Sequence, residues 1–377
     1  MSVRIVRSLE ESSWREFVDR HPWGNIFHTP EMFEVFSRAK GHRPELWAST
    51  DGNRILALLA PVRISLGSGA LRFLTTRAVS YGGALYDETP EGIAGLAAVL
   101  RGYSRQAGRS VLFTELRNLS DLTAVQDVMV DCGFSYEDHL NYLIPLSRPV
   151  EEVLLGFGRR TRKQIRQGLR RGDVTIQEAT GPEDLGICYD LLKRTYAAAR
   201  VPLADRSLFE AAFAVLSPLG MIRFPLAWIG ETCVAASVEL VYKDTVYGWY
   251  GGVDRRYVSY TPNELLVWHI LRWAAENGYR TYDFGGAGRP DEEYGVRTFK
   301  AKFGGKLVNF GRNVRHHAPW RLAVSRVGYS MYQRFMDVRS RQRAFSEARP
   351  RPLAKTESRP TRESGVSERE SQRGSRS

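Results

Sequence analysis

The chain repeats one alternation of apolar and polar positions twice. In its first half the pattern predicts a hairpin, a short strand, a long helix and a further strand. These elements cover residues 45–62, 81–86, 90–106 and 111–116. The hairpin turn is Asp51-Gly52-Asn53, and Gly108 follows the helix as its stop signal.

The second half predicts the same elements in the same order. They cover residues 226–241, 250–253, 262–276 and 282–284. Gly230-Glu231 forms the hairpin turn, and Gly278 ends the helix. A Tyr-Gly-Gly tripeptide begins the short strand in each half, at Tyr81 and at Tyr250. Two matching modules of this kind predict an α/β protein with an internal repeat.

This order of elements resembles the core of the GNAT-type acyltransferase fold. The resemblance implies two GNAT-like (acyl-CoA N-acyltransferase-type) domains with mixed sheets, lying side by side. A Rossmann fold is the other α/β candidate, but its G-x-G-x-x-G fingerprint is absent after a first strand.

A glycine-rich stretch near the end of the second module carries a second resemblance. Residues 282–288 read Tyr-Asp-Phe-Gly-Gly-Ala-Gly, a strand that ends in a loop where the backbone can approach a ligand. Residues 295–305 then read as a short helical or turn segment followed by a basic strand. Together they resemble the closing motif of the Fem family, the peptidoglycan bridge aminoacyltransferases. The resemblance covers roughly residues 1–315.

Composition narrows the class of protein. At 377 residues with 43% hydrophobic positions, the chain is long enough for two globular domains. It has no run of about 20 apolar residues and no signal peptide at its start. Its three cysteines lie far apart, which predicts a reducing compartment and no metal site. We expect a cytoplasmic protein, with contact to the inner face of the membrane as a further option.

Charge and composition set the expected domain limits. The net charge is +12, and residues 339–377 hold eleven Lys/Arg against five Asp/Glu, so +6 lies in that segment. It has almost no aliphatic residues, which predicts a disordered tail. The expected divisions are a first domain over 1–150, a second over 151–317 that opens with a basic helix, an amphipathic helix over 318–338, and the tail over 339–377.

The Fem resemblance supplies the catalytic candidates. It links Phe299 and Lys300 to the acyl donor and the reaction centre, where the lysine would hold a phosphate or stabilise charge on the attacked carbonyl. The alternative is a solvated lysine on a strand beside a core phenylalanine. Asp283 would orient the attacking amine or accept its proton, or would instead cap a loop.

The substrate-binding candidates are glycines, tyrosines and arginines. Glycines near a strand end allow either a bulge or a close backbone approach, and clustered arginines suit phosphate. The set comprises Tyr250, Gly251 and Gly252, Gly285 and Gly286, Tyr81, and Arg162 and Arg166 of the basic helix. His28 precedes a helix and is more simply a structural histidine.

The loop over 255–263 bears on the donor. It contains no glycine, unlike the pyrophosphate cradle of acetyl-CoA enzymes of the GNAT type. We therefore expect aminoacyl-tRNA as the donor and an amine acceptor, possible acceptors being a muropeptide, a lipid-linked precursor and a small amine. Acyl-CoA remains the alternative donor, and no tightly bound cofactor is expected.

A different class of function is also open. Basic surfaces suit a non-catalytic module that binds RNA or an anionic membrane, and residues 318–338 would then form an interfacial helix. Such binding requires neither the glycine-rich strand ends nor the Phe299-Lys300 pair, so the enzyme is the preferred interpretation.

Overall fold

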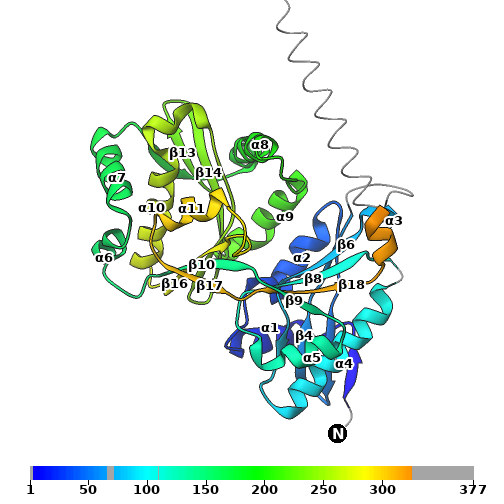
Figure 1. Ribbon diagram of the computed structural model, residues 1–377. Coiled ribbons are helices and arrows are strands. Elements are labelled where there is room, and N and C mark those ends of the chain that lie inside the picture. Colours follow the sequence, from blue (N-terminus) through cyan, green and yellow to red (C-terminus); the bar gives the residue numbers. More distant parts are fainter. Residues whose placement is uncertain (1–2, 66–71, 109, 325–377) are drawn as a thin grey trace, which may run out of the picture. The chain divides into compact units, whose positions relative to one another are not determined.

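Two lobes, each built on β-sheets with helices packed against them, make up the protein (Figure 1). The computed structural model describes residues 3–65, 72–108 and 110–324. Residues 319–324 are helical, and the rest of the predicted amphipathic helix lies outside these ranges, as does the predicted tail. The predicted α/β class with mixed sheets is confirmed.

The first lobe contains two sheets. The four-stranded sheet has the order β1 (Arg4–Val6), β3 (Trp47–Asp51), β4 (Arg54–Leu59), β7 (Leu85–Tyr86). The six-stranded sheet has the order β2 (His42–Pro44), β5 (Val62–Ile64), β6 (Arg77–Gly82), β8 (Phe113–Asn118), β18 (Arg312–His316), β9 (Ser135–Glu137). The β3–β4 turn is the predicted one, with Gly52 at φ +60°.

The helices of the first lobe are short apart from α4, which carries the core. They are α1 (Glu11–Arg20), η1 (Ile26–His28), α2 (Pro30–Arg38), α3 (Arg72–Thr75), α4 (Pro90–Ala107), η3 (Thr123–Val125) and α5 (Gln126–Asp131). The α4 helix begins with Thr89 as N-cap and Pro90 at its first position, and it buries Leu96, Val99 and Leu100. These residues pack under the sheets and fix the parallel pair β6–β8.

One large mixed sheet forms the second lobe. Its main order is β11 (Thr175–Glu178), β13 (Pro225–Ile229), β14 (Thr232–Tyr242), β15 (Thr245–Val253), β16 (Thr281–Gly286), β10 (Leu140–Pro145), β17 (Lys306–Asn309), and β12 (Ile222–Arg223) pairs with β14. The helices are α6 (Val150–Leu155), α7 (Arg159–Arg171), α8 (Pro182–Ala198), α9 (Arg206–Leu216), η4 (Ser217–Leu219), η5 (Arg255–Tyr260), α10 (Pro262–Glu276) and α11 (Gly295–Ala301). The α10 helix has the predicted limits, and Gly278 beyond it has φ +80°.

Two strands cross between the lobes. β10 comes from the sequence before residue 150 but pairs with β16 and β17 in the second lobe. β18 comes from the end of the second module but lies between β8 and β9 in the first lobe. The predicted limit at residue 150 therefore does not separate the sheets.

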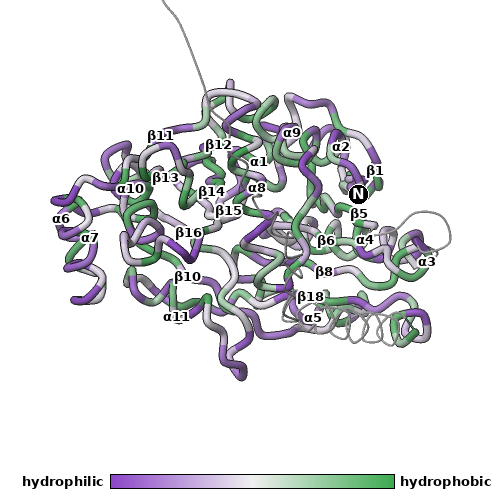
Figure 2. Tube along the Cα trace, turned by 90° about the horizontal axis from the view of Figure 1, so that it is seen from above, coloured by the Kyte–Doolittle hydropathy of each residue, from purple (hydrophilic) through white to green (hydrophobic). Residues whose placement is uncertain are grey.

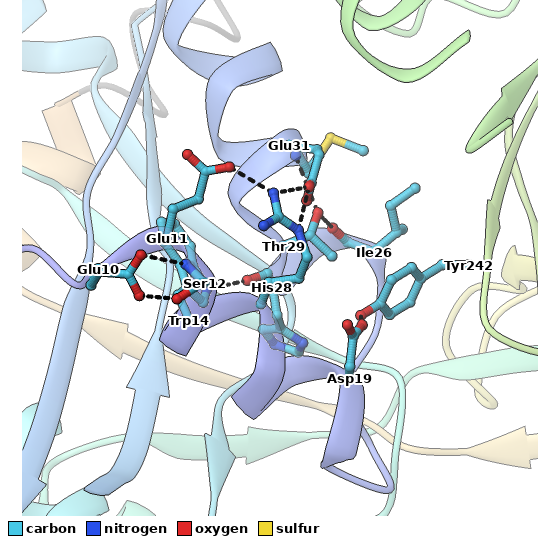
Figure 3. A network of polar contacts seen from close by, with 12 residues as sticks. Glu10, Glu11, Ser12, Trp14, Asp19, Ile26, His28, Thr29, Glu31 and Tyr242 are labelled. Atoms are coloured by element: carbon cyan, nitrogen blue, oxygen red, sulfur yellow. Dashed lines mark hydrogen bonds and ion pairs between the residues drawn. The ribbon is translucent and has the colours of Figure 1, made fainter. Parts of the chain in front are cut away.

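The lobes also share side-chain contacts. Phe36 of α2 and Phe209 of α9 belong to the same buried cluster. At another point the Tyr242 hydroxyl donates to the carboxylate of Asp19, and Figure 3 shows the two side chains facing each other. Lys243 donates to the backbone oxygens of Val18 and His21, both at 2.8 Å. The two lobes are therefore held as one unit.

Candidate active site

The strands β15 and β16 separate partway along their length. They pair in parallel only from Thr245–Tyr247 against Thr281–Asp283. Just beyond, β15 contains a bulge, because Glu239 of β14 pairs with Gly248 while Val238 pairs with Tyr250. The remainder of β15 stays on β14, and its other edge leaves β16. A wedge-shaped opening results at the C-terminal end of β16.

A cavity of about 460 Å³ fills this opening. Its wall is formed by β15 and β16 on two sides and by α8, α10 and α11 around them. The lining includes Tyr196 of α8, Asn263 and Leu266 of α10, and Tyr294 next to α11. Most of these groups are apolar or aromatic, so a bound reactive group would be shielded from water.

Glu239 and Tyr282 form a polar pair in the cavity wall. Both are buried, and the Tyr282 hydroxyl donates to Glu239 Oε2 at 3.1 Å. Gly248 lies against them, since a Cβ there would come within 2.7 Å of the Tyr282 hydroxyl oxygen. Burial raises the pKa of Glu239 to about 7, and hydrogen bonds from Ser237 and Tyr282 offset this only in part. A carboxyl group with this pKa can accept a proton near neutral pH.

Lys300 fixes the glycine-rich end of β16. Its side chain is only 8% exposed, and Nζ donates to the backbone oxygens of Phe284, Gly285 (3.1 Å) and Gly286 (2.8 Å). Burial lowers the pKa of Lys300 to about 8, while the charge of Asp283 acts in the opposite direction. The ammonium therefore uses its three N–H donors on its own chain.

Asp283 closes the turn that follows β16. Its carboxylate accepts the N–H of Gly285 at 2.7 Å and contacts Asn141 Nδ2 at 3.4 Å. Burial raises the pKa of Asp283 to about 6, against the effect of the Gly285 hydrogen bond and the Lys300 charge. This geometry is that of an Asx turn, which supports a structural role.

Comparison with known protein families gives a match within the second lobe. Residues 157–295 match the family model described as an acetyltransferase (GNAT) domain. A lipid II:glycine glycyltransferase of Staphylococcus haemolyticus (strain JCSC1435) is 37% identical over 62 residues. That match spans 15% of this chain and 15% of the relative.

Solved structures extend the likeness to both lobes. The crystal structure of FemX has a TM-score of 0.66 at 16% identity, covering 85% of this chain and 100% of that one. The chain therefore has the same fold as FemX, and the two predicted GNAT-like domains are present. A tandem GNAT protein from the clavulanic acid biosynthesis pathway, solved without AcCoA, also shares the fold, with a TM-score of 0.54 at 10% identity over 84% of this chain and 99% of that one.

Most candidates from the sequence lie around the cavity of the Fem-like fold. They are Tyr250, Gly251, Gly252, Gly285, Gly286, Phe299 and Lys300. The sequence interpretation of Lys300 as a possible solvated strand residue is wrong, because Lys300 lies on α11 and is buried. Phe299 packs against Phe303, and this contact anchors α11. The catalytic roles assigned to these residues stay predictions.

Other candidates lie elsewhere. Arg162 and Arg166 are on α7, whose buried positions Thr161, Ile165 and Gly168 face α10, so its basic residues form the outer side. The tube of α7 is correspondingly hydrophilic in Figure 2. Neither arginine lines the cavity. Tyr81 lines a second cavity, formed by residues of both lobes, and Asp283 lines a third.

His28 is part of the interior of the first lobe. It is fully buried, burial lowers its pKa to about 3, and its ring joins a capping box with Asn25. The Trp14 indole donates to its backbone oxygen at 2.6 Å (Figure 3). This agrees with a structural histidine. Among the described residues, no group of three His, Cys, Asp or Glu side chains is placed to hold a metal.

Glu239 was missed by the sequence analysis. A signal was present, since Glu239 is the lone charged residue in the run from Val234 to Val241, which is otherwise apolar except for Ser237. A carboxylate inside such a strand must be buried, and a buried carboxylate without a cation partner marks a candidate functional group.

Proposed function

We propose that the protein transfers an acyl or aminoacyl group to an amine, with the reaction centre in the cavity between β15 and β16. The observation that carries this proposal is the opening itself, where a parallel strand pair ends over a buried carboxyl group and a glycine-rich strand end. The GNAT family match over residues 157–295 covers most of these elements and supports acyl transfer as the reaction class.

The proposed reaction is a direct displacement. A neutral amine attacks the carbonyl carbon of an activated ester or thioester, the new C–N bond forms, and the C–O or C–S bond to the carrier breaks. The amine loses one proton, which Glu239 accepts, and the leaving oxygen or sulfur takes up one proton. Lys300 holds the backbone of Phe284, Gly285 and Gly286 in place for this reaction.

The N-terminus of α10 is poorly suited to the pyrophosphate of CoA. Pro262 is its first residue and offers no N–H, and Thr261 before it has φ +56°. Glu264 in the first turn adds negative charge, paired only with Lys302 at 3.6 Å. A phosphate there would lack amide donors and meet a carboxylate, so we favour aminoacyl-tRNA as the donor.

A basic surface suited to RNA is present on the same lobe. The outer side of α7 carries six arginines and one lysine along 13 residues, and the helix has no acidic residue in its first turn. It packs on α10, which lines the cavity. A tRNA acceptor stem that contacts α7 through its phosphates could reach the cavity with its aminoacyl end.

For the acceptor we propose a cell-envelope precursor that carries a free amine. The support is the likeness, over a short segment of 62 residues, to a lipid II:glycine glycyltransferase. A lipid-linked acceptor would also bring the protein to the inner face of an anionic membrane. None of the helices in the described part of the chain has the length and apolar character to cross one.

Donor binding tests this proposal against the acyl-CoA alternative. Calorimetric titration of the full-length protein with aminoacyl-tRNA is expected to give tight binding that weakens steeply with added salt, because several phosphates are neutralised. The double variant Arg162→Gln/Arg166→Gln should bind aminoacyl-tRNA more weakly than the wild type. Acetyl-CoA is expected to bind weakly or not at all. Micromolar, salt-insensitive acetyl-CoA binding followed by acetyl transfer would replace aminoacyl-tRNA with acyl-CoA as the donor.

A further inference from the structure

Three arginines lie on one face of the six-stranded sheet in the first lobe. They come from neighbouring strands: Arg77 from β6, Arg117 from β8 and Arg312 from β18. Arg312 and Arg117 are register partners, and Arg117 is also paired with Tyr81. Because side chains alternate along a strand, Arg77 shares the face of Tyr81 four residues later. The fold therefore gathers three guanidinium groups from distant parts of the sequence.

These arginines line a second cavity, of about 430 Å³. Its wall also contains Tyr81 and His139, and no described carboxylate is part of the lining. The cavity shares Tyr247, Trp249, Tyr250 and Gly286 with the cavity between β15 and β16. The two cavities therefore lie next to each other along the same segment of β15.

The positive charge of this cluster is only partly balanced. Glu115 lies beneath it and pairs with Arg117 at 3.1 Å and with Arg312. Burial would raise the pKa of Glu115, but the two arginines lower it by more, so the carboxylate is charged. Burial, together with Arg312, lowers the pKa of His139 to about 4, which leaves that ring neutral. Three positive charges face one negative charge.

Unused hydrogen-bond donors indicate what the cluster lacks. Nε of Arg77 and Nε of Arg312 are both buried and have no hydrogen-bond partner among the described residues. Glu137 is the register partner of Arg312 on β9, but it does not line the cavity. Arginines that served packing alone would be expected to have paired charges and satisfied donors. Guanidinium groups that keep unused N–H donors beside a cavity are suited to a carboxylate or a phosphate.

We propose that Arg77, Arg117 and Arg312 bind an anionic group of the amine acceptor, a carboxylate or a phosphate, and so select the acceptor. This assignment rests on the proposed acyl transfer. The acceptor is placed here because the α7 and α10 side of the other cavity is assigned to the donor. An acceptor anchored by its anion in the first lobe can extend its amine past Tyr250 toward the opening between β15 and β16.

Binding of simple anions tests the site without any transfer reaction. The full-length protein is titrated by calorimetry at low ionic strength with inorganic pyrophosphate and, separately, with succinate. We expect at least one of them to bind with one-to-one stoichiometry. Arg77→Gln and Arg312→Gln should each raise its Kd by about tenfold, the scale of losing one charge-assisted contact. Arg43→Gln on β2 of the same sheet removes an exposed arginine outside the cavity and should leave Kd unchanged.

The possible outcomes distinguish a phosphate from a carboxylate as the bound group. They also distinguish failure of the arginine site from failure of the proposed acyl transfer. Pyrophosphate binding alone identifies a phosphorylated acceptor, and succinate binding alone a carboxylate. No binding of either, or binding that Arg77→Gln and Arg312→Gln leave unchanged while both variants melt like the wild type, overturns the site. Once a transfer assay is in hand, Arg77→Gln should raise KM for the acceptor and not for the donor. Arginine-dependent anion binding without any acyl transfer would overturn the proposed function and the acceptor assignment instead.

Discussion

At the scale of single residues, the candidate active site contains two buried ionisable groups with different roles. Glu239 is buried and forms no ion pair with any described residue, and the Tyr282 hydroxyl donates to it at 3.1 Å. Lys300 is buried too, but its ammonium is satisfied by backbone oxygens. The first group is free to exchange a proton, whereas the second holds the strand end that faces the substrate.

Glu239→Gln is expected to stabilise the protein and to impair transfer. The pKa of Glu239 is raised to about 7 in the folded state from 4.5, so the folded state binds the proton more tightly and stability falls as pH rises between these values. Removing the charge should add about 1–3 kcal/mol at pH 8 and much less at pH 5. Transfer should fall by about 10²-fold or more.

Denaturant unfolding at the two pH values and initial transfer rates check this. Glu231→Gln, in the exposed turn before β14, is the matched control and should change neither quantity. Equal stability of Glu239→Gln at both pH values would show that Glu239 is not the group that titrates.

Lys300→Met is expected to leave a folded but less stable protein with about 10²-fold slower transfer. The methionine fills similar space but leaves three backbone oxygens without their charged donor, at a cost of roughly 1.5–3 kcal/mol. Thermal melting and initial rates measure the two effects. Lys302→Met at the C-cap of α11, where the side chain is 44% exposed, is the control. Turnover of Lys300→Met near the wild-type rate would rule out a role in the reaction.

At the scale of elements, local signals predicted most of the second lobe. Turn residues and helical periodicity depend on neighbours in sequence, and so the hairpin around Gly230 and the helix from Pro262 to Glu276 were predicted correctly. The opening between β15 and β16 was not visible in this way. It depends on the bulge at Trp249, next to Gly248, which exists only in the pairing with β14.

Gly248→Ala tests that bulge. The added Cβ would lie 2.7 Å from the Tyr282 hydroxyl oxygen and 3.6 Å from Glu239 Oε2, so the polar pair must move. We expect a loss of about 1–3 kcal/mol in the free energy of unfolding. Gly251→Ala on the same strand is the control, because its Cβ would meet nothing closer than Ala236 O at 4.0 Å. Equal stability of the two variants would mean that the backbone at Gly248 is not tightly constrained.

At the scale of the whole molecule, the exchange of β10 and β18 makes the lobes interdependent. Sequence patterns gave two modules but not this exchange, because pairing partners far apart in the chain leave no local signal. The same limit applies to the arginine cluster, since Arg77, Arg117 and Arg312 meet only through the sheet order. The contacts of Lys300 could not be predicted from the sequence for a similar reason, because they join α11 to the distant strand β16.

A fragment of residues 1–150 is expected not to fold. It lacks β18, whose absence leaves β8 and β9 without their common partner, and it exposes β10 as an unpaired strand. Circular dichroism and thermal melting of the fragment measure this. Adding residues 310–324 through a flexible linker should restore part of the structure. Cooperative unfolding of the unextended fragment would contradict the interdependence of the lobes.

The central claim is that acyl groups are transferred to amines in the opening between β15 and β16. The most direct measurement is the rate of label transfer from tRNA charged with a radioactive amino acid to an amine-bearing cell-envelope precursor, with wild-type, Glu239→Gln and Glu231→Gln proteins side by side. We predict transfer by the wild type and by Glu231→Gln, and a rate about 10²-fold lower for Glu239→Gln. Transfer that is equally fast in all three proteins would contradict the assignment of the reaction to this opening.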